Sequence, residues 1–218
     1  MRHVHQNKIF KIDPLHPESQ HIENAAQVLL DGGVIAYPTE TVYGLGANAM
    51  NENAIDRIFQ LKGRESDKAI LIIVHDHQAV EPLVAEMPEN ACRLAEAFWP
   101  GPLTMVFKAS PSLSSRITSP NHTIGIRVPD NRFCLDLLAR TGVPLTSTSA
   151  NRSGGANPVR IEDVLADFGD DLDLYIDGGP SRSNIPSTVL DVTMDTPVIR
   201  RAGVLNREVI EEIIGDLG

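Results

Sequence analysis

Residues 33–47 read GVIAYPTETVYGLGA, an apolar run that gives way abruptly to hydroxyls, a carboxylate and glycines. The run 33–37 has the length and β-branched content of a covered strand, and Pro38 cannot donate a ladder N–H, so we predict that the strand ends there. The residues after Pro38 are predicted to form a loop, in which Gly44 and Gly46 permit close approaches that a side chain would block. Such a loop suits a polar ligand, although a glycine-punctuated turn without a ligand has the same composition.

Outward from this stretch, strand-like runs alternate with amphipathic helical stretches, a pattern typical of α/β proteins. Strand candidates are 8–12, 33–37, 70–74, 103–108, 123–128, 144–148, 173–176, 187–192 and 197–201. Helix candidates are 19–31, 52–62, 89–98, 131–141, 161–168 and 206–216. Asp130 and Asn206 are predicted to be N-cap residues, since each can accept a backbone N–H just ahead of a helix.

Composition limits the classes of function. The 218 residues, 42% of them hydrophobic, favour one domain with a substantial core. A net charge of −10 has the wrong sign for a protein that binds nucleic-acid backbones over its whole surface. It does not exclude a local basic cleft. Cys92 and Cys134 lie far apart and outside any zinc-ligand spacing, so neither a disulfide framework nor a metal site is predicted.

The N-terminal residues contain no secretory signal, and no run approaches the roughly 20 apolar residues that span a bilayer. A soluble, cytoplasmic protein with no membrane partner is therefore expected. His3, His5 and His16 lie in this leader without carboxylate or cysteine neighbours in metal-ligand spacing, so we assign them to the surface.

The segment LKGRESDKAI at 61–70 brings Lys62 and Arg64 to the end of a predicted helix. The helix dipole favours cations there, which is a purely structural explanation. A lysine ammonium beside a planar arginine guanidinium is also the usual pair of groups that binds a polyphosphate. Neither a P-loop nor a G-x-G-x-x-G helix start occurs in the chain, so any nucleotide site must be built from scattered loops.

The segment PLTSTSANRSGGANP at 144–158 begins as a strand and ends in small polar residues. Ser147, Thr148, Ser149 and Asn151 lie where the strand gives way to a loop, a position that ligands favour in open α/β sheets. A Ser/Thr turn with local hydrogen bonds is the structural alternative. A serine hydrolase is a weak candidate, because no G-x-S-x-G elbow is present and His122 has no partner identifiable from sequence.

Seven segments together resemble the YrdC-like threonylcarbamoyl-AMP synthases, in order and spacing, from about residue 20 to 205. They are PTETVYGLGANA, KGR, WPGPLT, TIGIRVPD, STSANRSG, PSTVLDVT and RRAG. The resemblance implies a single α/β domain over 1–218, with a twisted mixed β-sheet flanked by helices and a concave ligand cleft. The chain resembles the short, single-domain form, for which we expect a leader and first strand at 1–18 and a C-terminal helix at 206–218.

The implied activity is that of a nucleotidyltransferase, which joins L-threonine, bicarbonate and ATP into threonylcarbamoyl-adenylate and pyrophosphate. The product passes to a separate transferase that modifies an adenosine of tRNA. Mg²⁺ is implied as an ion held mainly by the ATP phosphates, since such ions keep several waters and few protein ligands.

The resemblance also implies roles for individual residues. The implied catalytic residues are Lys62 and Arg64. The implied ATP-binding residues are Lys62, Arg64, Ser66, Thr123, Ser147, Ser149, Asn151 and Arg201. The implied threonine-binding residues are Thr39, Tyr43, Arg127 and Ser187. Glu40 either holds the loop, pairs with a basic residue or acts directly in catalysis.

The chain departs from the family pattern at Glu65, Ala69 and Ala202, which lie beside the phosphate-binding segments. Close paralogues of altered activity lack the Ser-x-Asn motif, whereas Ser149-Ala150-Asn151 is intact here. The alternative function is weak binding of tRNA or duplex RNA through a basic patch. That patch would comprise Lys62, Arg64, Lys68, Arg127, Arg152, Arg200 and Arg201.

Overall fold

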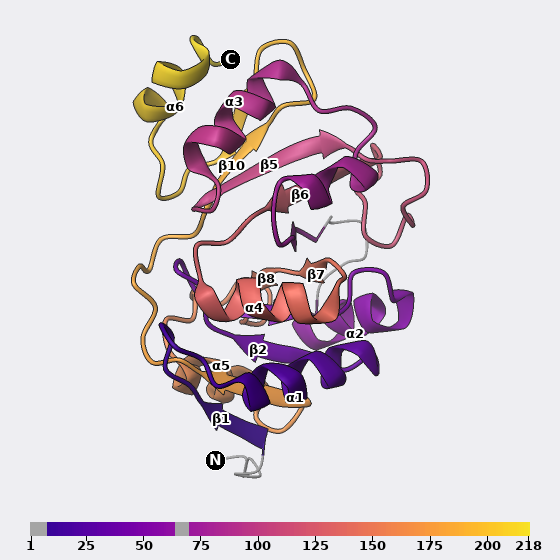
Figure 1. Cartoon of the computed structure of the whole chain (residues 1–218), viewed down its shortest axis with the longest axis vertical. Helices are drawn as coiled ribbons and strands as arrows, with labels where there is room; N and C mark the ends of the chain where they lie inside the picture. Colours follow the sequence, from indigo (N-terminus) through magenta and orange to yellow (C-terminus); the bar gives the residue numbers. More distant parts are fainter. Residues whose placement is uncertain (1–7, 64–69) are drawn as a thin grey trace.

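A computed structural model describes residues 8–63 and 70–218, and its chain trace is drawn in Figure 1. Its helices are α1 (Ser19–Leu30), α2 (Glu52–Lys62), α3 (Glu89–Phe98), α4 (Arg132–Thr141), α5 (Ile161–Phe168) and α6 (Arg207–Ile214). A 3₁₀ helix, η2, spans Gln78–Leu83. Arg64 and Ser66, together with Glu65, Lys68 and Ala69, lie outside the described residues.

The strands form two mixed sheets. The first has the order β1 (Ile9–Lys11), β9 (Leu174–Asp177), β2 (Ile35–Tyr37), β3 (Gly44–Gly46), β8 (Thr148–Ser149). The second has the order β11 (Val198–Arg201), β10 (Thr188–Asp191), β5 (Leu103–Lys108), β6 (Thr123–Arg127), β4 (Ile72–Ile73), β7 (Leu145–Thr146). The structure thus confirms the predicted α/β class with mixed β-structure, and divides the strands between two sheets.

Thr146 joins the two sheets. Its backbone N–H donates to the Ala47 carbonyl at 2.9 Å, its hydroxyl accepts from the Ala47 N–H at 2.9 Å, and its carbonyl accepts from the Tyr37 hydroxyl at 3.1 Å. A hydrophobic cluster is continuous from Val34 and Tyr175 beside the first sheet to Met105 in the second. The two sheets therefore share one core.

Helices α1 and α4 cover the first sheet, as Figure 1 shows, and bury a second apolar cluster against it. Ile22 and Leu29 of α1 and Leu137 of α4 pack there with Ile35 of β2. The Cys134 thiol of α4 also donates to the Pro38 carbonyl at 3.3 Å. This packing holds the end of β2, and hence the start of the 38–43 loop, in place.

The predicted helices and strands are all present, with three corrections. The prediction of continuous loop after residue 37 was wrong, because 44–46 form strand β3, antiparallel to β2. The predicted strand 144–148 is interrupted at Ser147, whose N–H donates to the Leu71 carbonyl at 2.7 Å. The N-cap of α4 is Asn131, not Asp130, since the Asn131 side chain accepts from Cys134 N at 3.1 Å. Asn206 caps α6 as predicted.

The glycines of β3 pack against an aromatic ring. A Cβ on Gly46 would lie 2.5 Å from the Tyr37 ring, and one on Gly44 would lie 3.1 Å from it. The prediction that these glycines permit a close approach is confirmed, but it is Tyr37 that approaches.

Across the described residues, every helix is too short or too polar to cross a membrane.

Candidate functional site

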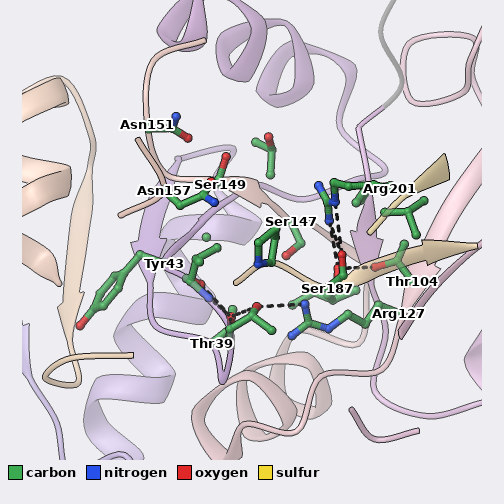
Figure 2. A pocket seen from close by; sticks show the side chains of 18 of the residues that line it. Thr39, Tyr43, Thr104, Arg127, Ser147, Ser149, Asn151, Asn157, Ser187 and Arg201 are labelled. Atoms are coloured by element: carbon green, nitrogen blue, oxygen red, sulfur yellow. Dashed lines mark hydrogen bonds between the residues drawn. The ribbon is translucent and has the colours of Figure 1, made fainter. Parts of the chain in front are cut away.

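A cavity of about 480 Å³ lies between the two sheets, and Figure 2 shows its side chains. In the second sheet, β6 and β11 run antiparallel to β5 and β10. The ends of β6 and β11 therefore meet the starts of β5 and β10 at one edge. In the first sheet, β3 reverses β2 and β8 reverses β3, so the 38–43 loop and Ser149 share an edge.

Most of the predicted site residues come together here. The cavity is lined by Thr39, Tyr43, Lys62, Arg127, Ser147, Ser149, Asn151, Ser187 and Arg201. Thr123 lies outside the lining, at the far end of β6 from Arg127, about 13 Å along the strand. Its hydroxyl is hydrogen-bonded with that of Ser119 at 2.7 Å.

Arg201 is held against the start of β10. Its Nη2 donates to the Ser187 carbonyl at 2.9 Å and to the Ser187 hydroxyl at 3.1 Å. That hydroxyl is also 2.8 Å from the Thr104 hydroxyl of β5, as Figure 2 shows. Desolvation, with the positive charge of Arg127 nearby, lowers the pKa of Arg201. Two guanidinium groups thus face the same cavity, an arrangement that favours an anion.

Lys62 ends α2 with its ammonium group buried. The Nζ atom donates to the Ser149 carbonyl at 2.6 Å and to the Asn151 carbonyl at 2.8 Å. Gly63 beyond it adopts a left-handed conformation with φ of 60° and ends the helix. The cation therefore also connects α2 to the end of β8 and to the residues just after it, which the sequence did not indicate.

The Arg127 side chain is buried beside the 38–43 loop. Its Nη2 pairs with Glu40 Oε1, and its Nη1 donates to the Thr41 hydroxyl at 3.2 Å. Of the three roles left open for Glu40, pairing with a basic residue is the one seen. Glu40 itself is not among the residues that line the large cavity.

Two of the predicted threonine-binding hydroxyls already have partners in the protein. The Thr39 hydroxyl donates to the Val42 carbonyl at 2.7 Å, accepts from Thr41 N and Val42 N, and lies 2.9 Å from the Thr41 hydroxyl. Its single donor is thus used, and the Thr41 hydroxyl and the two N–H groups share its two acceptor positions. The Tyr43 hydroxyl points away from the cavity in Figure 2 and donates to the Gly179 carbonyl at 2.6 Å.

Other polar side chains keep hydrogen-bonding capacity. Within 8–63 and 70–218, the side chains of Ser149 and Asn157 have no hydrogen-bond partner, and Asn151 Oδ1 is buried without one. The Asn151 amide nitrogen donates to the Gly155 carbonyl at 2.8 Å. These groups lie on the side of the cavity opposite Arg201 in Figure 2.

Several residues of the cavity were not predicted from the sequence, and the polar ones among them include Thr104, Ser153 and Asn157. Thr104 is almost fully buried in β5, and a hydroxyl in an otherwise apolar strand was the available signal. Asn157 lies in a Gly-rich loop and carried no signal of its own.

The cavity lining is cationic among the described residues. Lys62, Arg127 and Arg201 contribute positive charge, and no described carboxylate lines the cavity. No cluster of three or more His, Cys, Asp or Glu side chains suited to a metal occurs in the described ranges. The arrangement fits a polyanion held between cations and hydroxyls.

Of the basic patch proposed for RNA, Lys62, Arg127 and Arg201 line the cavity, whereas Arg152 and Arg200 are paired with carboxylates. Arg152 pairs with Asp171 at 3.2 Å and stacks over Phe168. Arg200 pairs with Asp191 at 2.7 Å. Both of these cations are compensated by carboxylates, and Lys62 and Arg127 are buried.

Comparison with known proteins adds to this geometry. A family model for Sua5, YciO and YrdC proteins, described as "Telomere recombination", matches residues 27–203. The threonylcarbamoyl-AMP synthase of Bacillus subtilis is 40% identical over 206 residues, which cover 94% of this chain and 60% of that protein. The chain spans about 60% of the length of the first curated relatives that it matches.

Two solved structures share the fold closely. P. abyssi Sua5 in complex with L-threonine superposes with a TM-score of 0.93 at 40% identity, covering 96% of this chain and 61% of that one. E. coli YciO superposes with a TM-score of 0.84 at 30% identity, covering 91% of this chain and 96% of that one.

Proposed function

Because the chain belongs to the Sua5/YciO/YrdC family, we propose that it is an enzyme, a threonylcarbamoyl-AMP synthase. It would make threonylcarbamoyl-adenylate and pyrophosphate from L-threonine, bicarbonate and ATP. The observation that carries the proposal is the cationic cavity, in which Lys62, Arg127 and Arg201 meet hydroxyls without a described carboxylate. The threonine complex of the similar P. abyssi protein supports threonine as one substrate.

The chemistry requires no protein nucleophile. Threonine's amine adds to bicarbonate with loss of water, or to CO2 with loss of a proton, and so forms a carbamate. A carbamate oxygen then attacks the α-phosphorus of ATP, and the bond from that phosphorus to the oxygen bridging the β-phosphate breaks, which releases pyrophosphate. The protein's part is to position the reactants and offset negative charge. Arg201 and Lys62 would act on the phosphates, while Arg127 would hold the threonine carboxylate.

Mg²⁺ is part of the proposal as an ion carried by the phosphates. A lining without described carboxylates fits that arrangement, since Mg²⁺ in such sites keeps water and substrate oxygens as ligands. When bound, the ion would offset charge on the phosphates. Besides Lys62 and Arg201, Ser149 and Asn157 would face these phosphates, because their side chains have hydrogen-bonding capacity to spare.

A downstream tRNA threonylcarbamoyl-transferase is the proposed partner, because the adenylate product must be consumed by an acyl transfer. A cytoplasmic location is also proposed, which the two unpaired cysteines favour. Binding of tRNA or duplex RNA is the less supported alternative, since Arg152 and Arg200 already have carboxylate partners.

The test is pyrophosphate release with each substrate omitted in turn. ATP should give AMP and pyrophosphate only when threonine and bicarbonate are both present, and the adenylate should be detected by mass spectrometry. Valine, which lacks the hydroxyl, should be used at least about 100-fold less well than threonine if the cavity hydrogen-bonds that hydroxyl. Pyrophosphate release without threonine would contradict the proposal. Tight duplex RNA binding unaffected by ATP would favour the alternative instead.

A further inference from the structure

We propose that Glu40 and Thr41 are positioning residues, which fix the Arg127 guanidinium so that it presents one orientation to an amino-acid carboxylate in the cavity. The inference rests on the proposed function for the identity of that substrate. The observation behind the proposal is a series of hydrogen bonds that runs from Glu40 through Arg127 and Thr41 to Thr39.

Glu40 pairs with Arg127 from a position outside the lining of the large cavity. Its side chain is 10% exposed, and its Oε1 accepts from Arg127 Nη2. It borders a separate cavity of about 220 Å³, formed with Pro14, Asn131 and Ser181, and not the large one. A carboxylate that does not line the large cavity is poorly placed to take a proton from a substrate there, so a role as general base is disfavoured.

Arg127 depends on these two contacts for its orientation. The guanidinium side chain is 7% exposed, and its Nε has no hydrogen-bond partner in the described part of the chain. Among the described residues, its side-chain hydrogen bonds go to Glu40 and Thr41 alone. Removing either one would allow the planar fork to rotate, and a rotated fork loses the geometry that matches a carboxylate.

Thr41 couples the arginine to the loop. Its hydroxyl accepts from Arg127 and contacts the Thr39 hydroxyl, which donates to the Val42 carbonyl. The Cys134 thiol anchors the loop start at the Pro38 carbonyl. The chain of bonds therefore ends on a fixed backbone, which is what a positioning contact needs.

Charge adds to this geometry. Arg127 and Arg201 are close enough for repulsion to lower the pKa of Arg201, after desolvation. The Glu40 carboxylate offsets the charge of Arg127 and so reduces that repulsion when no anionic ligand is present. A neutral replacement of Glu40 would leave two cations, Arg127 and Arg201, facing one cavity without this carboxylate.

The experiment compares Glu40→Gln, Thr41→Val and Thr41→Ser with the wild-type chain. Gln and Val keep the side-chain shapes and remove the charge or the hydroxyl, whereas Ser keeps the hydroxyl. Asp173→Asn is the matched control, because Asp173, just before β9, pairs with Arg57 of α2 and lines neither cavity. The readouts are calorimetric titration with L-threonine, steady-state kinetics and melting temperature.

We expect Glu40→Gln and Thr41→Val to weaken threonine binding and raise its KM on the order of 10-fold, with the KM for ATP little changed. Thr41→Ser should remain near wild type, and Asp173→Asn should change only the melting temperature. Glu40→Gln and Thr41→Val binding threonine as well as wild type would overturn the inference. A loss of kcat at unchanged threonine affinity, with a lost acidic limb in the pH profile, would overturn it in favour of a base.

The two proposals fail separately. Absence of threonine-dependent pyrophosphate release from the wild-type chain would reject the synthase function, while the titration still decides the positioning role. Absence of threonine binding by the wild-type chain would reject the positioning role as stated.

Discussion

Lys62 combines a structural and a functional position. From the sequence, a cation at a helix C-terminus contributes about 0.3–1 kcal/mol to stability, so its removal was expected to affect turnover more than folding. In the structure its ammonium group is buried and donates to two main-chain carbonyls, that of Ser149 at the end of β8 and that of Asn151 just after it. Loss of the amine would leave both carbonyls without this donor.

We therefore predict that Lys62→Met lowers the free energy of unfolding by about 1–3 kcal/mol as well as abolishing activity, because buried acceptors lose their partner. Lys108→Met is the control, since Lys108 forms an exposed pair with Glu86 and should change stability by less than about 0.5 kcal/mol. Urea unfolding measures both. Equal stability of the two variants would show that the Lys62 contacts are not structural.

At the scale of elements, the β2–β3 hairpin depends on its glycines. Tyr37 is fully buried, and its hydroxyl donates to the Thr146 carbonyl across the joint between the sheets. The ring therefore cannot swing away from β3 without losing that bond. Gly46 and Gly44 provide the space that it occupies.

We predict that Gly46→Ala destabilises the protein by about 1–3 kcal/mol or more, because the new methyl group would overlap the Tyr37 ring. Gly44→Ala should cost less, since its Cβ would lie 3.1 Å from the ring against 2.5 Å for Gly46. Thermal melting of the two variants tests this order. The reverse order, or two silent variants, would contradict the packing described.

At the scale of the whole molecule, a buried thiol and buried phenol groups make the free energy of unfolding depend on pH in the alkaline range. Burial, with the Glu40 charge nearby, raises the pKa of the Cys134 thiol well above its usual range. Burial also raises the pKa of Tyr37 strongly and that of Tyr175 to about 12. In the unfolded chain these groups titrate between about 8.5 and 10, so above that range the unfolded state binds fewer protons than the folded one.

Stability should therefore be unaffected by these groups below about pH 8 and fall as pH rises through 9 and 10, by up to about 1.4 kcal/mol per pH unit for each group. Cys134→Ala should reduce this slope by the contribution of one group. Cys92→Ala is the matched control, because Cys92 is exposed and should leave the slope unchanged. Melting curves between pH 7 and 10.5 measure it, and a flat profile for the wild-type chain would contradict the prediction.

The sequence by itself determined the elements and the segments that meet at the cavity. Periodicity located helices such as α2 and α3 and strand β5, because side-chain spacing is a local property of 3.6- and 2-residue repeats. Motif resemblance also indicated Arg127, Ser187 and Arg201 as partners, although they lie far apart in the chain.

Only the tertiary structure decided which groups face the cavity and which serve the fold. Thr39 and Tyr43 were predicted as binding hydroxyls, yet Val42 and Gly179 occupy their donors. Thr123 shares a strand with Arg127, but strand geometry places it at the opposite end. Glu40 finds its partner 87 positions along the chain because the packing of the two sheets brings β6 beside the 38–43 loop. Hydrogen-bond capacity and strand direction depend on such long-range pairings, which local sequence patterns do not encode.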